Sequence, residues 1–217
     1  MEKEEILKKI MDNLSGKDKD TIDVAYAISK IAHSNQKREN GYCYAVHPIR
    51  VALTLEKFLK ANTSGFGDDG YVYDRFLDQC EIPSKGLVEA GLLHDVMEDT
   101  ELTNKDIYDV FASKGHEKFY IEYIDTPLRI ITHDKNEDYE TYIKRVLTNP
   151  TAALVKMADL NDNLNIFDLN SLTLEKYNRS LNYLRYIKMI NDKYHFIENA
   201  QRYRESVLGW IGDWSGN

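Results

Sequence analysis

The residues best suited to chemistry in this sequence are one imidazole and three carboxylates that fall close together, His94, Asp95, Glu98 and Asp99. They lie in the segment 92–100, LLHDVMEDT, whose apolar residues predict a helix with one buried side. At about 100° per residue, His94, Asp95 and Glu98 share a face beside that apolar side. Such groups beside a core are costly unless a cation compensates them, so the segment predicts part of a divalent metal site.

Two further candidate ligands interrupt helical apolar patterns elsewhere, His47 at the start of 47–60 and Asp159 within 152–167. With His94 and Asp95 they make a set of two imidazoles and two carboxylates. A mixed nitrogen and oxygen set suits Mn²⁺, Fe²⁺, Co²⁺ or Zn²⁺ better than Ca²⁺ or Mg²⁺. We therefore expect His47, His94, Asp95 and Asp159 to hold one divalent transition metal, with Mn²⁺ ahead of the other three.

The acidic pair Glu98 and Asp99 follows the His94-Asp95 pair by one helical turn. Carboxyl groups at that spacing can exchange a proton with a metal-activated water or a leaving oxygen. The alternative is that they end one helix and cap the next, but acidic residues at a helix C-terminus oppose the helix dipole. We expect Glu98 and Asp99 to be catalytic.

Four blocks of the sequence resemble the HD-domain metal-dependent phosphohydrolases, and within them the stand-alone RelA/SpoT-type (p)ppGpp hydrolases. The blocks are 32–38 AHSNQKR, 44–52 YAVHPIRVA, 92–100 LLHDVMEDT and 155–164 VKMADLNDNL. They occur in the family's order and span most of residues 20–195. The resemblance implies an HD-domain helical bundle, and it implies an acid/base role for Glu98 and Asp99.

The resemblance also implies that Arg38, Lys156 and Asn163 line a nucleotide pocket. Arg38 could stack on a purine or bind phosphate through two hydrogen bonds, or it could be part of a solvated loop. Lys156 could face a phosphate or neutralise a carboxylate. Asn163 lies four residues after Asp159 on the same helix face, where packing alone does not account for an amide.

Several positions depart from the family's pattern or have no motif. Glu39 stands where a second basic residue is usual, and Asn161 and Asp162 replace commoner apolar or basic residues. His33 belongs to the first block and is expected near the metal as a hydrogen-bonding neighbour. His116 and His133 match no motif, and a second metal would be expected only if they supplied ligands.

Helical periodicity dominates the chain, and no period-two alternation is long enough to predict a sheet. We expect an all-α bundle in which Pro83 starts the central helix and Pro127 breaks or kinks the helix 117–132. Thr103 and Asp106 have the spacing of a capping box. The segment 61–82 is an irregular insertion to which we assign a short helix near 72–79.

The length of 217 residues is expected to form a single HD domain. The net charge of −8 argues against a nucleic-acid partner, since binding to a phosphate backbone requires a basic surface. No apolar run has membrane-spanning length and the N-terminus lacks a signal-peptide pattern, so we expect a cytoplasmic protein with no membrane partner. The oligomeric state is left open.

Three functions are compatible with these observations. The first is a guanosine 3′,5′-bis(diphosphate) 3′-pyrophosphohydrolase that acts on a small nucleotide through a metal-activated water. The second is an HD phosphohydrolase for another nucleotide or phosphoester, which Glu39 favours. The third is a metal- or nucleotide-binding module without turnover, which has no need of Glu98 and Asp99 as proton carriers.

Overall fold

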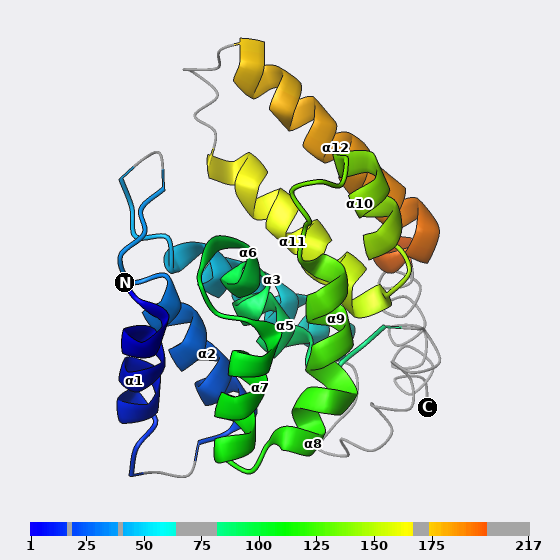
Figure 1. The fold of residues 1–217 in the computed structure, drawn as a ribbon. Coiled ribbons are helices and arrows are strands. Elements are labelled where there is room, and N and C mark those ends of the chain that lie inside the picture. Colours follow the sequence, from blue (N-terminus) through cyan, green and yellow to red (C-terminus); the bar gives the residue numbers. More distant parts are fainter. Residues whose placement is uncertain (17–18, 39–40, 64–81, 167–173, 199–217) are drawn as a thin grey trace, which may run out of the picture.

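The computed structural model describes residues 1–16, 19–38, 41–63, 82–166 and 174–198. Helices occupy most of these ranges (Figure 1). Their bounds are α1 Lys3–Asn13, α2 Thr21–Ala32, α3 Val46–Thr63, α5 Leu87–Leu93, α6 Val96–Asp99, α7 Asn104–Ser113, α8 Glu117–Phe119, the π-helical turn η1 Tyr120–Ile124, α9 Asp125–Ile131, α10 Tyr139–Val146, α11 Pro150–Ile166 and α12 Leu174–Tyr194.

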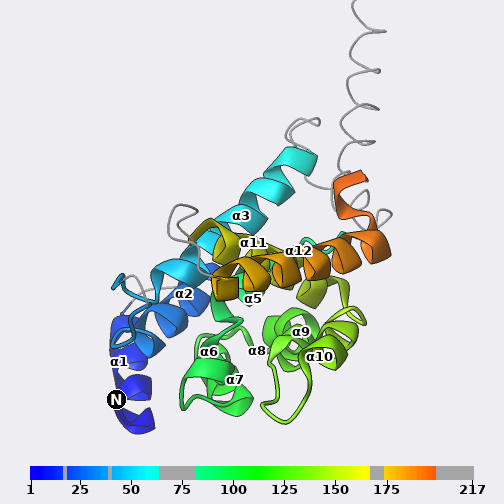
Figure 2. The ribbon, with the colours of Figure 1, turned by 90° about the horizontal axis from the view of Figure 1, so that it is seen from above.

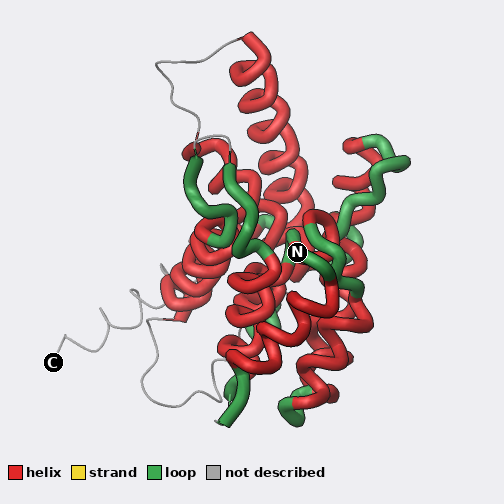
Figure 3. The backbone as a smooth tube through the Cα atoms, turned by 60° about the vertical axis from the view of Figure 1, so that its left-hand side comes forward, coloured by secondary structure: helices red, strands yellow, loops and turns green. Residues whose placement is uncertain are grey.

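The all-α prediction is confirmed. In the described ranges no segment forms a strand (Figure 3), and the one β-type pairing is an isolated bridge between Lys37 and Cys43. That bridge closes a hairpin between α2 and α3, in which the Tyr44 N–H donates to the Gln36 carbonyl. The hairpin brings Arg38 back toward the helices.

The short helix α5 is the centre of the bundle. It packs against α2, α3, α9 and α11, and α12 lies across α11 on the outside (Figures 1 and 2). Its sequence, LVEAGLL, is apolar almost all round, as expected for a helix with neighbours on every side. The one acidic residue, Glu89, is buried and accepts a hydrogen bond from the Thr21 hydroxyl.

The prediction of one helix through 92–100 is wrong, because the backbone breaks at His94 and Asp95. α5 ends at Leu93 and the single turn α6 begins at Val96. Asp95 adopts φ −95° and ψ −7°, which lies in the bridge region outside regular α-helical values. Its carbonyl oxygen accepts hydrogen bonds from the backbone N–H groups of both Glu98 and Asp99. At this break both carboxylate oxygens of Asp95 face the histidines.

The central helix also begins later than predicted, at Leu87 instead of Pro83. Gly86 precedes it with φ +74°, a left-handed conformation that glycine adopts without steric cost. A Cβ at Gly86 would lie 2.7 Å from Tyr123 Cβ and 2.9 Å from the Tyr123 carbonyl oxygen. Gly86 therefore permits both the turn and the contact between α5 and η1.

The predicted disturbance at Pro127 is present, but it takes the form of a change in helix type. Residues 117–131 run as α8, the π-helical turn η1 and α9, with Pro127 buried in the first turn of α9. Proline has no N–H for an intrahelical bond, and a widened turn preceding it accommodates the ring. The capping box at Thr103 and Asp106 is confirmed at the start of α7.

Some predictions concern residues outside the described ranges. The short helix expected near 72–79, most of the 61–82 insertion and Glu39 all lie there. The single-domain assignment stays a prediction. Within the described residues, no helix combines the length and apolar character required to cross a membrane.

Replacing Gly86 with alanine should destabilise the fold by about 3 kcal/mol, combining left-handed strain with the clash against Tyr123. Gly115→Ala is a matched control, because Gly115 has φ +81° but open space around it. Its expected cost is about 1 kcal/mol from the backbone alone. Urea unfolding of both variants measures the difference, and equal losses would contradict the packing role of Gly86.

Candidate metal centre

Three separate parts of the bundle supply the predicted metal ligands. His47 lies in the first turn of α3, next to Pro48, and Asp159 lies in α11. His94 and Asp95 form the break between α5 and α6. Because α5 packs against both α3 and α11, these side chains meet in the interior of the bundle.

The two imidazoles point their Nε2 atoms at the same two carboxylates. Asp159 Oδ1 lies 3.0 Å from His47 Nε2 and 3.8 Å from His94 Nε2. Asp95 Oδ1 lies 3.0 Å from His94 Nε2, and Asp95 Oδ2 lies 3.4 Å from His47 Nε2. His47, His94 and Asp95 each offer a ligand atom within 4.8 Å of the others. The arrangement is that of a mixed nitrogen and oxygen site for one divalent ion.

The opposite nitrogen of each ring is already occupied. His47 Nδ1 lies 2.6 Å from Asp162 Oδ2, and His94 Nδ1 lies 2.9 Å from the Gly91 carbonyl oxygen. Both partners accept hydrogen bonds, so each Nδ1 carries a proton, and each ring offers Nε2 to a metal once that nitrogen has lost its own proton. His94 Nε2 is buried and makes no hydrogen bond of acceptable geometry, which is the environment expected of a metal ligand.

Asp159 is oriented by two neighbours on its own helix. The Lys156 ammonium lies 2.8 Å from Oδ2, and the Asn163 amide donates to Oδ1 over 2.7 Å. Lys156 is largely buried and also faces the rings of Tyr139 and Tyr142. Of its two expected roles, the partner of a carboxylate is the one observed, while contact with a phosphate stays a prediction.

Asp95 differs from Asp159 in its partners. Its Oδ2 accepts a hydrogen bond of 2.7 Å from the Tyr44 hydroxyl, and within the described part of the chain no lysine or arginine pairs with it. The Asp95 charge is therefore balanced only by the imidazoles, and a cation between them would complete the balance.

The pKa values of the clustered histidines and carboxylates are shifted in the directions that favour positive charge at this site. Burial disfavours the imidazolium of His94, but Asp95 and Asp159 outweigh it and raise its pKa to about 10. Burial likewise opposes the charge on His47, whose pKa is raised by hydrogen bonds to Asp159 and Asp162. Although burial favours protonation of Asp159, the Lys156 charge lowers the pKa of Asp159 well below its usual range. Without a metal, protons occupy the place of the cation.

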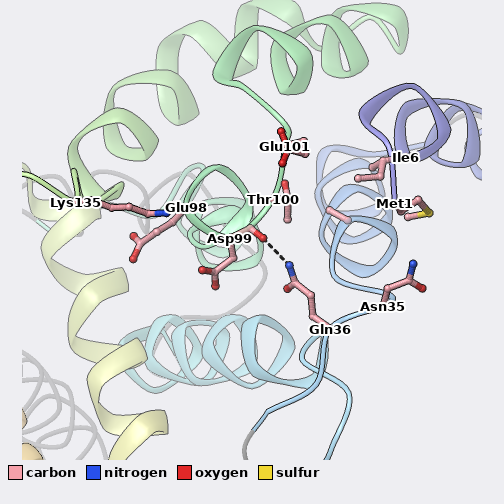
Figure 4. Close-up of a pocket in the computed structure, with 10 residues that line it drawn as sticks. Met1, Ile6, Asn35, Gln36, Glu98, Asp99, Thr100, Glu101 and Lys135 are labelled. Carbon is pink, nitrogen blue, oxygen red and sulfur yellow. Dashed lines mark hydrogen bonds between the residues drawn. The ribbon is translucent and has the colours of Figure 1, made fainter.

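The predicted acid/base pair lies at the edge of a polar cavity of about 470 Å³ (Figure 4). The cavity is lined by Asn35, Gln36, Glu98, Asp99 and Lys135, among others. Glu98 Oε2 accepts from the His133 N–H over 3.1 Å, and partial burial raises the pKa of Glu98. A raised pKa lets this carboxyl group carry a proton nearer to neutral pH.

A chain of contacts from the AHSNQKR block holds Asp99. The buried ring of His33 lies 2.7 Å from Gln36 Oε1 through Nδ1, and the Gln36 amide donates to the Asp99 carbonyl over 2.5 Å (Figure 4). His33 also packs on Tyr44, with ring centroids 4.9 Å apart. It lies beside the cluster, as expected.

Arg38 and Asn163, predicted to bind substrate, are in direct contact. Arg38 Nη2 donates to Asn163 Oδ1 over 2.5 Å, and the guanidinium lies 5.6 Å from the centre of the Tyr44 ring. Asn163 therefore links Arg38 to Asp159, a predicted metal ligand. The contact of Arg38 and Asn163 with a nucleotide stays a prediction.

His116 and His133 do not join the cluster. His116 Nε2 lies 2.6 Å from the Lys19 carbonyl oxygen, and His133 Nε2 lies 2.9 Å from that of Glu137. In the described residues neither belongs to a group of side chains able to hold a metal. A second metal is expected only if both histidines supply ligands, and these contacts give no support to that alternative.

Two residues to which we assigned no role lie inside the cluster. Tyr44 donates to Asp95, and Asp162 faces His47 and Arg50. Burial disfavours the charge on Asp162, but hydrogen bonds from His47 and Arg50 lower its pKa to about 2. A signal for Asp162 was present in the sequence, because it follows Asp159 by three residues, which places both on one helix face.

Similar proteins support the resemblance. No family model matches the chain. The chain is 29% identical over 143 residues, 64% of its length, to a guanosine-3′,5′-bis(diphosphate) 3′-pyrophosphohydrolase of Aquifex aeolicus. It is 27% identical over 159 residues, 71% of its length, to the bifunctional (p)ppGpp synthase/hydrolase SpoT of Escherichia coli. The matched regions cover 17% and 19% of those proteins, so the chain spans less than a fifth of their length.

A solved structure described as a metazoan ortholog of SpoT that hydrolyzes ppGpp has the same fold. The TM-score is 0.54 at 19% identity, and the alignment covers 91% of this chain and 99% of that one. The chain therefore resembles the HD-type (p)ppGpp hydrolases in sequence and shares the all-α fold of one of them.

Affinity for Mn²⁺ should rise with pH between about pH 6 and about pH 8, by up to about tenfold per pH unit for each proton displaced. The pKa values of His47 and His94 are raised, so an incoming ion must displace protons that become easier to remove as pH increases. Calorimetric titration in buffers of different ionisation heat would measure both affinity and proton release. Affinity that is constant or falls with pH would contradict the assignment.

Proposed function

We propose that this chain is a metal-dependent phosphohydrolase, and specifically a guanosine 3′,5′-bis(diphosphate) 3′-pyrophosphohydrolase. Water would add to the phosphorus bonded to the 3′ oxygen of the ribose, and the bond from that phosphorus to the 3′ oxygen would break. The 3′ oxygen would take a proton, leaving GDP or GTP and pyrophosphate.

One observation carries this proposal: two imidazoles and two carboxylates converge, and the carboxyl groups that follow Asp95 by three and four residues, Glu98 and Asp99, line a polar cavity. Support also comes from the relatives, whose names describe hydrolysis at the 3′-pyrophosphate. A pocket that only senses a ligand has no need of a carboxyl group with a raised pKa at its edge.

The metal we propose is one divalent transition ion, Mn²⁺ ahead of Fe²⁺, Co²⁺ or Zn²⁺, held by His47, His94, Asp95 and Asp159. When bound, such an ion polarises a phosphoryl oxygen and lowers the pKa of a coordinated water toward about 7. The donor set fits, since two neutral imidazoles and two carboxylates satisfy the preferences of these metals.

The remaining residues have separate tasks in this mechanism. Glu98 exchanges the proton between the water and the leaving 3′ oxygen, and Asp99 assists from the same turn. Tyr44 holds Asp95 through its hydroxyl, which keeps the carboxylate directed at the imidazoles. Arg38 and Asn163 form the side that contacts the nucleotide, where a guanidinium can bind phosphate or stack on the base.

A second candidate is the same reaction type on another nucleotide, and one sequence feature favours it. Glu39 places a negative charge next to Arg38 in the sequence, where a highly phosphorylated substrate would be repelled. Product analysis separates the two. The Mn²⁺-loaded protein is incubated with guanosine and adenosine polyphosphates, NADPH and nucleoside monophosphates. Pyrophosphate with GDP or GTP is the expected result, and preference for another compound would select the second candidate.

Glu98→Gln should retain the metal and lower turnover by about 10²- to 10⁴-fold, because it removes the proton carrier while keeping the side-chain shape. His47→Ala should lose the metal and the turnover together. Asp109→Asn is the control, since Asp109 is exposed on α7 and pairs with Lys105. Metal content by mass spectrometry and rates of pyrophosphate release provide the test. Full activity in Glu98→Gln would remove this residue from the mechanism.

A further inference from the structure

We propose that Asp162 is a positioning residue of the metal centre, which fixes the His47 ring in the orientation that metal binding requires and joins this ligand to Arg38. The proposal rests on the proposed metal-dependent function. It concerns a buried side chain that departs from the usual pattern of the resembling family and is not one of the four predicted ligands.

The first step is the contact with His47. Asp162 is 8% exposed, and its Oδ2 lies 2.6 Å from His47 Nδ1. An ionised carboxylate only accepts hydrogen bonds, so His47 must donate through Nδ1. The neutral ring then has its lone pair on Nε2, the atom 3.0 Å from Asp159 Oδ1. A carboxylate behind a ligating imidazole also fixes the plane of the ring.

The second step is the way in which Asp162 is itself held. Arg50 contacts both carboxylate oxygens, with Nε 2.6 Å from Oδ1 and Nη2 3.0 Å from Oδ2. Arg50 follows His47 by three residues on α3, so both reach Asp162 from the same helix face. The two-pronged contact removes rotational freedom from the carboxylate. The orientation of His47 is thus set by α11.

The third step is a closed set of contacts that includes Arg38. Arg38 Nη1 lies 3.4 Å from Asp162 Oδ2, and Arg38 Nη2 donates to Asn163. The Asn163 amide in turn donates to Asp159 Oδ1, which faces His47 Nε2. The proposed nucleotide-binding side therefore connects to both sides of the His47 ring. If substrate displaced Arg38, the hydrogen bonds that orient the His47 ring would change.

A purely structural role for Asp162 makes a different prediction. In that case the ion pair with Arg50 would tie α3 to α11, and loss of either partner would have the same effect. Arg50 is 42% exposed at its side chain, and an ion pair this open to solvent contributes little to stability. The contact with His47 is the buried part of the arrangement, so we place the function of Asp162 there.

The test compares three variants by calorimetric titration with Mn²⁺ and Zn²⁺. Asp162→Ala should weaken metal affinity by about 10- to 100-fold, the usual effect of losing the partner of a ligating histidine. Asp162→Asn preserves the shape and should lose less. Arg50→Gln removes one hold on the carboxylate but leaves Arg38 and His47 in contact with Asp162, so it should lose less than about threefold. Circular dichroism and thermal unfolding verify that each variant folds.

A second readout follows His47 itself. In the Zn²⁺-loaded wild type, the Nδ1 proton should appear in NMR spectra as a downfield resonance that exchanges slowly with water. It should disappear or exchange quickly in Asp162→Ala and persist in Arg50→Gln, an outcome that helix tethering alone does not produce.

The outcomes separate this proposal from the function on which it rests. If wild type binds neither metal, the metal centre and this role fall together. If wild type binds and Asp162→Ala binds equally well, the role of Asp162 is overturned while the metal centre stands. Equal losses in Asp162→Ala and Arg50→Gln would assign Asp162 to helix packing. Should Asp162→Ala fail to fold, unchanged affinity in Asp162→Asn together with loss of the Nδ1 resonance would also overturn the proposal.

Discussion

The close approach of α3 and α5 determines where the two histidines meet. A Cβ on Gly91 would lie 2.6 Å from Leu55 Cδ1 and 3.4 Å from Ala52 Cα, so the glycine leaves room for the Leu55 side chain where the two helices meet. The imidazoles of His47 and His94 consequently lie 5.2 Å apart between ring centres. The Gly91 carbonyl also accepts from His94 Nδ1, so the same residue contacts α3 and orients the His94 ring.

The carboxylates around His47 and His94 differ in the positively charged groups that pair with them. Asp159 is neutralised by Lys156, and Asp162 by Arg50 and Arg38, whereas Asp95 has, among the residues that the structure describes, only the imidazoles and the Tyr44 hydroxyl. Burying these carboxylates is favourable only if each finds a positive partner, and Asp95 is the one that calls for an added cation. The apolar surroundings that make the core stable also strengthen every one of these electrostatic contacts.

The fold class and the convergence of His47, His94 and Asp159 were predictable from the sequence, while the local geometry was not. Apolar periodicity identified the helices, and polar interruptions at His47, His94 and Asp159 identified residues that converge. The break at Asp95 was missed because backbone bending between α5 and α6 depends on tertiary contacts that local propensity does not contain. Asp162 shares a helix face with Asp159, but its contact with His47 comes from α3, more than a hundred residues earlier in the chain, and spacing alone does not reveal that contact.

The most direct measurement is an anomalous difference map from crystals of the Mn²⁺-loaded protein, recorded on either side of the manganese absorption edge. The account predicts one strong peak between His47 Nε2 and His94 Nε2, within bonding distance of the Asp95 and Asp159 carboxylates. A peak at another location, or none at these four side chains in protein that turns over substrate, would contradict it.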